Sequence, residues 1–261
     1  MVAYAEDMHY TWVPSAGHDS AGGDTIYVKT RGTQMSSLNY SSYLKIESLL
    51  SLPEPQTNPE ERVTYSAEYF FIVTHQTSEL WLSQVLLDLS VGTTALQEER
   101  YIQAAEVIER CAVVIEMMTR HLNALSTMLP TRFREFRGNL GTASGRQSVQ
   151  FHSLDRELGM DARHQSPLFE ALEDVCGRTG IDLDSLVLSQ SSQPNLSRVV
   201  SAMLDLSRQV WKWKATHVEL VVHMIGTSER GTGDTSGAHF LAARLDMPFP
   251  RLWEAVSRAY H

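Results

Sequence analysis

The sequence predicts an all-α helical bundle preceded by an N-terminal arm. Alternation of apolar and polar residues, which is the pattern of a half-buried strand, is nearly absent from the 261 residues. Three long stretches instead repeat apolar residues at helical spacing, and Pro130 and Gly226 end two of them. No internal repeat is present. We therefore expect an arm over residues 1–37 and one helical domain over residues 38–261.

The elements follow from spacing and from helix-ending residues. The arm is polar, is rich in Gly and Ser, and holds at most a short hairpin around residues 25–29. A short helix is expected to begin near Asn39 and to end before Pro53. The stretch 132–145 is expected to be mostly loop. The other expected helices are about 64–89, 101–129, 148–158, 167–176, 195–226 and a last segment that reaches Glu254.

Composition indicates a globular protein, with 43% hydrophobic and 20% charged residues. The net charge of -9 argues against nucleic acid or an anionic membrane as the main partner. No run reaches the roughly 18 apolar residues of a spanning helix, and the first residues lack the regions of a signal peptide. We therefore expect a cytoplasmic protein without a membrane partner.

Cysteine usage excludes several kinds of site. Cys111 and Cys176 are the two cysteines, and they stand in unrelated contexts. This pattern predicts neither a disulfide framework nor a CxxC metal site. A CxxCH motif, which attaches c-type haem covalently, is also absent.

Two histidines interrupt apolar helical stripes. His75 shares its face with Phe71, Leu82 and Leu86, and His217 stands in a second stripe far from any other histidine or cysteine at metal-ligand spacing. A lone histidine on such a face is usually a core residue bonded to a carbonyl group. A haem iron, however, needs one protein ligand on its proximal side and a polar residue opposite. Spacing alone leaves both possibilities open.

Four segments, in order along the chain, resemble the tryptophan 2,3-dioxygenase family, the haem enzymes that open the indole ring of tryptophan. The resemblance extends from about residue 38 to residue 255. The segments are Tyr40–Leu44, Phe71–Trp81, Phe136–Ser148 and His217–Gly233.

The resemblance implies haem b as the cofactor and O2 as a co-substrate. His217 matches the proximal ligand of the haem iron, and His75 matches the catalytic distal histidine near the oxygen and the indole N–H. Phe71, one turn before His75, would line the same distal pocket beside haem and substrate. A neutral imidazole is a suitable axial ligand for ferrous iron.

The resemblance also implies a site for an amino acid. Arg137 matches the arginine that binds the carboxylate, and Thr232 matches the threonine that contacts the ammonium group. A guanidinium group binds a carboxylate through two parallel hydrogen bonds, and glycines around Thr232 permit close approach and loop closure. Without the resemblance, Arg137 would be a solvated residue and the glycine-rich segment an ordinary loop.

The resemblance further implies a homotetramer in which N-terminal segments are exchanged. Tyr40, Tyr43 and Leu44 match residues that a neighbouring subunit donates to the pocket. Their spacing alone is equally typical of core residues on one helical face.

Two departures from the family pattern bear on the substrate and product. Phe133 replaces a tyrosine four residues before Arg137, and Asp234 follows Gly233 where the family has a second glycine. We expect dioxygenation of L-tryptophan or a substituted tryptophan to N-formylkynurenine. The alternative is monooxygenation of tryptophan or β-methyltryptophan to a 2-oxindole in secondary metabolism.

Two further hypotheses come from other classes of protein. His75, Glu79 and His217 match the composition of a non-haem iron site with two histidines and a carboxylate. A sensor that binds haem or an indole without turnover is the other. The non-haem iron hypothesis leaves the matches at Arg137 and Thr232 unused.

Overall fold

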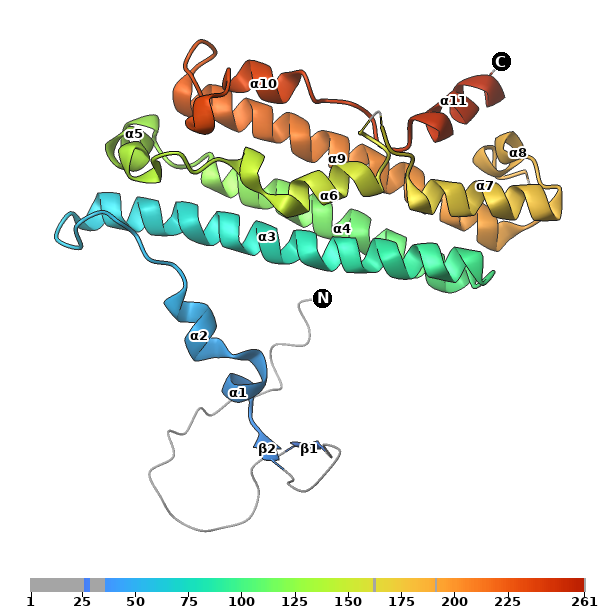
Figure 1. Ribbon diagram of the computed structural model, residues 1–261, viewed down its shortest axis with the longest axis horizontal. Coiled ribbons are helices and arrows are strands. Elements are labelled where there is room, and N and C mark those ends of the chain that lie inside the picture. Colours follow the sequence, from blue (N-terminus) through green and yellow to red (C-terminus); the bar gives the residue numbers. More distant parts are fainter. Residues whose placement is uncertain (1–25, 29–35, 162, 191, 261) are drawn as a thin grey trace. The chain divides into compact units, whose positions relative to one another are not determined.

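The computed structural model describes residues 26–28, 36–161, 163–190 and 192–260. The chain divides into two compact units, Met1–Leu52 and Pro53–His261. Figure 1 traces the order of the elements. The domain boundary expected after residue 37 stays a prediction.

The first unit contains a short hairpin and two short helices. Strand β1 (Ile26–Val28) pairs antiparallel with β2 (Ser36–Leu38), so a hairpin does form where residues 25–29 were expected to support one. Helix α1 (Tyr40–Leu44) is capped by Asn39, whose side chain accepts a hydrogen bond from the Ser42 backbone at 2.8 Å. Helix α2 (Ile46–Ser51) follows.

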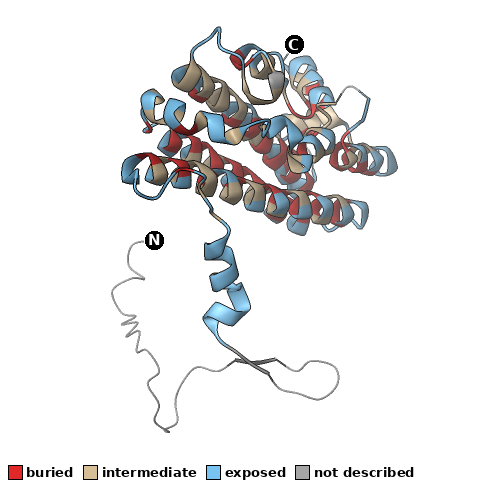
Figure 2. Cartoon of the chain, turned by 60° about the vertical axis from the view of Figure 1, so that its left-hand side comes forward, coloured by how far each residue is buried: buried red, intermediate tan, exposed pale blue. Residues whose placement is uncertain are grey.

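Three long helices form the core of the second unit. Helix α4 (Tyr101–Leu125) packs extensively against both α3 (Arg62–Gln97) and α9 (Pro194–Ile225), and Figure 1 shows the three side by side. Fully buried side chains occupy both contacts, including Leu82, Val85, Ile108, Ile115, Leu206 and Val210. In Figure 2 the buried residues accordingly follow the inner faces of the helices.

Shorter elements cover this core. Helices α6 and α7 pack on α3, α8 and α10 pack on α9, and α11 packs on α8. The bounds are α5 (Pro130–Phe136), α6 (Val149–Glu157), α7 (Pro167–Thr179), α8 (Leu183–Val187), α10 (Ala238–Ala242) and α11 (Pro250–Ala259), with short 3-10 helices at η1 (Arg137–Leu140), η2 (Gly145–Gln147) and η3 (Thr232–Asp234).

The all-α fold class is confirmed, while several element boundaries differ from the expectation. Pro130 was expected only to end a helix, but it is also the first residue of α5. Proline is favourable there, because the backbone N–H groups in the first turn of a helix have no hydrogen-bond partner within the helix. Much of the stretch 132–145 is therefore helical. Helix α3 continues to Gln97 rather than ending near Leu89. Among the described helices, none combines the length and hydropathy needed to cross a membrane.

A buried carboxylate ties α3 to α4. Asp88 is 2% exposed and accepts hydrogen bonds from Arg110 Nε at 2.8 Å and Nη2 at 2.7 Å. Gln84 Nε2 donates a third hydrogen bond at 3.0 Å. Burial raises the pKa of Asp88, but the hydrogen bonds from Arg110 and Gln84 and the charge of Arg110 together lower it by more. The pKa of Asp88 therefore lies below the usual 3.8.

Asp88→Asn should destabilise the protein by about 1–3 kcal/mol at pH 7, because the Arg110 guanidinium loses its charged acceptor. The pKa of Asp88 is lowered in the folded state, so its contribution is present above pH 3.8 and is lost as pH falls through the folded pKa. Urea unfolding should therefore show the difference between variant and parent shrinking below pH 3.8. A difference that is the same at pH 7 and at the acid end would contradict this assignment.

Candidate active site

Two histidines from separate helices meet in the second unit. His75 belongs to α3 and His217 to α9. Burial and, to a smaller extent, charge repulsion from the nearby His75 together lower the pKa of His217 to about 4. The ring of His75 remains accessible to solvent, although the surrounding protein also lowers its pKa. The two imidazoles therefore lie close enough for their charges to interact, and both are neutral at pH 7.

One hydrogen bond determines which ring nitrogen of His75 carries the proton. Its Nδ1 lies 2.7 Å from the carbonyl oxygen of Phe71, one helical turn earlier. Because a carbonyl only accepts, Nδ1 carries the proton, and in the neutral ring Nε2 is left with a lone pair. Burial, the largest influence, lowers the pKa of His75, and the Phe71 carbonyl and Glu79 oppose it only in part. Nε2 of His75 is thus an acceptor of hydrogen bonds.

His217 is suited to be an axial haem ligand. Within the described part of the chain, neither of its ring nitrogens makes a hydrogen bond, and the ring is neutral. An unprotonated imidazole nitrogen is what coordination to haem iron requires. In haem the nitrogen atoms of the porphyrin also bind the iron, so one ligand from the protein is sufficient. The residues present therefore fit a haem.

The geometry does not support a non-haem iron site. No group of three or more His, Cys, Asp or Glu side chains that could hold a metal ion occurs among the described residues, which include His75, Glu79 and His217. The Glu79 carboxylate instead accepts a hydrogen bond from Gln150 Nε2 at 3.0 Å. These three residues therefore do not come together as a group of potential metal ligands in this structure.

Aromatic side chains extend from His75 to α5. The ring of Phe71 lies 4.1 Å from the His75 ring, centroid to centroid, and its predicted role in a distal pocket stays a prediction. Phe71 also contacts Phe133 at 5.7 Å and Phe136 at 5.6 Å. Phe133 and Phe136 meet edge to face at 5.4 Å. The last of these rings, Phe136, immediately precedes Arg137 in the chain.

Arg137 and Thr232, which are far apart in the sequence, line one hollow of about 720 Å³. Arg137 is 29% exposed. Its Nη2 donates to the carbonyl oxygen of Arg230, and its Nη1 lies 4.0 Å from the Glu229 carboxylate. The complete lining is Arg134, Arg137, Gly138, Gly141, Thr142, Gln147, Gly231, Thr232 and Gly233. The hollow therefore combines cationic groups, a hydroxyl group and glycine backbone.

The loop that carries Thr232 requires its glycines. Gly233 has a φ of 68°, and a Cβ atom there would lie 2.7 Å from the Cβ of Ser144. Gly237 has a φ of 61°, and a Cβ atom there would collide with the carbonyl oxygen of Glu229. The loop is thus folded tightly on itself and against Ser144. The side chain of Asp234 lies outside the described residues, and its predicted role stays a prediction.

The predicted residues of the first unit do not join a site within that unit. Tyr40 is 74% exposed, Tyr43 is 70% exposed and Leu44 is 42% exposed. No residue of α1 or α2 is buried. The single chain therefore leaves these apolar side chains uncovered.

Sequence reasoning missed several residues that shape this region. Glu229 and Arg230 contact Arg137, and Glu68 and Asn139 join the segment around it, as described below. Glu68 could have been recognised from the sequence, because it places a carboxylate on the same helical face as Phe71 and His75.

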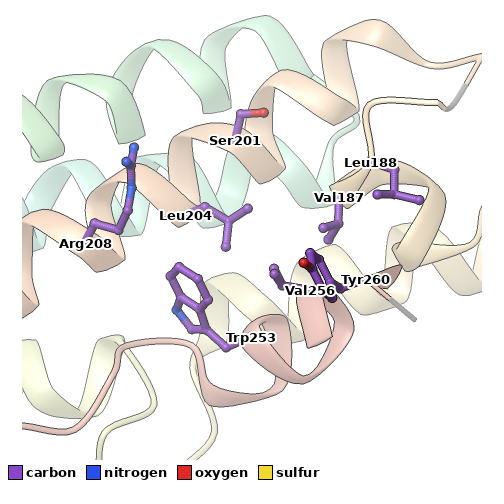
Figure 3. Close-up of a pocket in the computed structure, with 8 residues that line it drawn as sticks. All are labelled: Val187, Leu188, Ser201, Leu204, Arg208, Trp253, Val256 and Tyr260. Carbon is purple, nitrogen blue, oxygen red and sulfur yellow. The ribbon is translucent and has the colours of Figure 1, made fainter. Parts of the chain in front are cut away.

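A second hollow, of about 440 Å³, lies between α8, α9 and α11 and contains none of the predicted site residues. Figure 3 shows Leu204, Trp253 and Val256 around it. It is lined mainly by apolar side chains, and its α9 residues come from the first half of that helix, before His217.

Comparisons with known proteins identify the family of the chain. Residues 27–179, more than half of the chain, match the family model described as tryptophan 2,3-dioxygenase. The chain is 30% identical over 255 residues to the tryptophan 2,3-dioxygenase of Herpetosiphon aurantiacus, covering 83% of this chain and 96% of that protein. It is 27% identical over 288 residues to the tryptophan 2,3-dioxygenase of Burkholderia mallei, and this match covers 92% of each chain. It is 29% identical over 257 residues to the tryptophan 2,3-dioxygenase of an Arthrobacter species, and this match covers 82% of this chain and 89% of that protein. The chain therefore belongs to the tryptophan 2,3-dioxygenase family.

Proposed function

We propose that the protein is a haem-dependent oxygenase that adds oxygen at C2 and C3 of the indole ring of L-tryptophan, or of a substituted tryptophan, to give N-formylkynurenine. The observation that carries this proposal is the pair of neutral, electrostatically interacting histidines, His75 and His217. The hollow with Arg137 and Thr232 would supply the site for the amino acid part of the substrate.

His217 would hold haem b through its unpartnered ring nitrogen. When bound, the haem supplies the activation of O2, the co-substrate. The depressed pKa of His217 keeps its ring neutral at physiological pH, so that protons do not compete with iron. Position 217 would therefore bind the cofactor without taking part in substrate recognition.

His75 would orient the indole ring. Its Nε2 accepts a hydrogen bond, and the indole N–H is a donor that has no acceptor capacity. The bond between Nδ1 and the Phe71 carbonyl holds the imidazole in this tautomer. His75 would thus bind the indole N–H and could take the proton from the indole nitrogen onto Nε2.

Arg137 and Thr232 would bind the two charged groups of the amino acid. The guanidinium group pairs with the carboxylate, and the Thr232 hydroxyl accepts from the ammonium group. Glu229, 4.0 Å from Arg137, then competes with the substrate carboxylate for the same cation. Substrate binding in this hollow should therefore displace Glu229 from Arg137.

The protein is further proposed to be a homotetramer in which each N-terminal segment contributes to a neighbouring pocket. The exposure of Tyr40, Tyr43 and Leu44 supports this proposal, since such side chains are usually covered in an assembly. The partners of the protein would then be further copies of itself.

His217→Ala should abolish stoichiometric haem binding, because neither neighbouring turn of α9 offers a second histidine or cysteine on that face. His75→Ala should keep the haem but lower turnover, because only the acceptor for the indole N–H is lost. The Soret absorbance per protein and the rate of O2 consumption with L-tryptophan measure the two effects. Loss of haem from His75→Ala alone would reverse the two assignments.

Arg137→Ala should weaken transition-state binding of L-tryptophan by about 2–4 kcal/mol, because a charge-assisted bidentate contact is removed. Indole-3-ethylamine, which lacks the carboxylate, should lose little. The measurement is kcat/KM for both compounds, or inhibition by the amine if it is not turned over. Equal losses for both would remove Arg137 from the substrate site.

The product separates dioxygenation from monooxygenation, and Asp234 is predicted to influence it. A carboxylate there would pair with the substrate ammonium and hold its proton, disfavouring transfer of the second oxygen atom. Asp234→Gly should then shift any 2-oxindole, which gains one oxygen atom, toward N-formylkynurenine, which gains two. Mass spectrometry of the products gives the ratio. Asp234 is not the N-cap residue of α10, because that residue is Gly237. An unchanged product ratio in Asp234→Gly would contradict the proposed influence of Asp234 on the product. Absence of any product from the haem-loaded protein would favour the sensor.

A further inference from the structure

Arg137 stands where two short elements meet. It follows the last residue of α5, which has seven residues, and begins η1, which has four. Helices this short have few hydrogen bonds of their own and little intrinsic stability. The orientation of Arg137 must therefore depend on what these elements contact.

Those contacts come from one face of α3. Thr64, Glu68, Phe71 and His75 are spaced by four, three and four residues, which places them on the same side of the helix. Phe71 contacts Phe133 and Phe136, as described above. The same face that carries His75 therefore also holds α5.

Thr64 holds the residue two positions before Arg137. The buried Thr64 donates from Oγ1 to Glu135 Oε2 at 2.6 Å. Arg132 Nη1 donates to the same carboxylate at 2.9 Å and 3.0 Å. The Thr64 hydrogen bond is the largest influence that lowers the pKa of Glu135. Glu135 is thus a fixed anion that joins α5 to α3.

Glu68 holds the residue two positions after Arg137. Its carboxylate, only 2% exposed, accepts from the backbone N–H groups of Gln56 at 3.1 Å and Thr57 at 2.8 Å, and from the Thr57 hydroxyl. Asn139 Nδ2 donates to Glu68 Oε2 at 3.2 Å and to Thr57 Oγ1 at 3.3 Å. A buried carboxylate with this many donors is held in one orientation.

We infer that Glu68, together with Thr64, is a positioning residue that fixes the Arg137 guanidinium with respect to His75. The inference rests on the proposed function, in which Arg137 binds the carboxylate and His75 the indole N–H. Glu68 precedes His75 by seven residues, which is roughly 10 Å along a rigid helix. Helix α3 thereby sets the separation of the two ends of the substrate site, and Glu68 contributes to selection of substrates that carry an α-carboxylate.

The test begins with Glu68→Gln in the haem-loaded enzyme. The variant keeps the shape but turns an NH2 group toward groups that are themselves donors, so the contact with Asn139 is weakened. We expect KM for L-tryptophan to rise about tenfold while kcat changes less than about twofold, with an unaltered Soret band and unaltered inhibition by indole-3-ethylamine. Asn139→Ala, a change at an exposed residue, should show the same pattern more weakly and replaces Glu68→Gln if that variant does not fold.

Asp88→Asn is the matched control. It also removes a buried, multiply hydrogen-bonded carboxylate from α3, but it lies 13 residues beyond His75. It should lower stability and leave KM for both compounds unchanged. If Asp88→Asn raises KM for L-tryptophan as much as Glu68→Gln, the effect is one of general stability and the inference is overturned.

A double-variant cycle gives the decisive result. If Glu68 acts through Arg137, Glu68→Gln should have no further effect on kcat/KM for L-tryptophan once Arg137 is alanine. Additive losses would overturn the inference while leaving the role of Arg137 intact. If Arg137→Ala alone fails to discriminate between L-tryptophan and indole-3-ethylamine, the proposed function of Arg137 fails instead, so the two failures are distinguishable.

Discussion

The separation of α3 and α9 by α4 is the constraint on which the site depends. Helix α4 packs against both neighbours, and its apolar residues are buried on two sides, Ile108 and Ile115 among them. Interiors packed at this density transmit small changes in volume to the backbone. The distance between His75 on α3 and His217 on α9 therefore depends on how these two helices pack against α4.

The two histidine rings differ in their hydrogen bonds to the protein and therefore in what each ring nitrogen can bind. Burial lowers the pKa of both rings, and their proximity disfavours a second positive charge. His75 is then fixed as an Nδ1–H tautomer by the Phe71 carbonyl, whereas His217 makes no hydrogen bond within the described residues. The first ring could thus accept a hydrogen bond from a substrate, and under the proposed function the second would use its lone pair to bind iron.

The sequence predicted those parts of the molecule that depend on short-range periodicity. Apolar spacing indicated α3, α4 and α9, and the two histidines were visible as interruptions of apolar stripes. Arg137 and Thr232 are brought together by short, irregular elements that have no periodic pattern, so only the resemblance to a family pointed to them. Glu68 was missed because its donors come from separate segments, around Thr57 and Asn139, whose contact depends on tertiary structure.

The residues proposed to bind haem and those proposed to bind substrate come from different parts of the fold. His217 belongs to a long helix whose contacts with α4 dominate the core, while Phe133 and Arg137 belong to short elements held against one face of α3. Under the proposed function, a phenylalanine instead of a tyrosine at position 133 changes a side chain near Arg137 without changing any residue of α4 or α9. Asp234, the other departure from the family pattern, also lies outside these two helices. Both departures would therefore affect how the substrate is held more than how haem would be held.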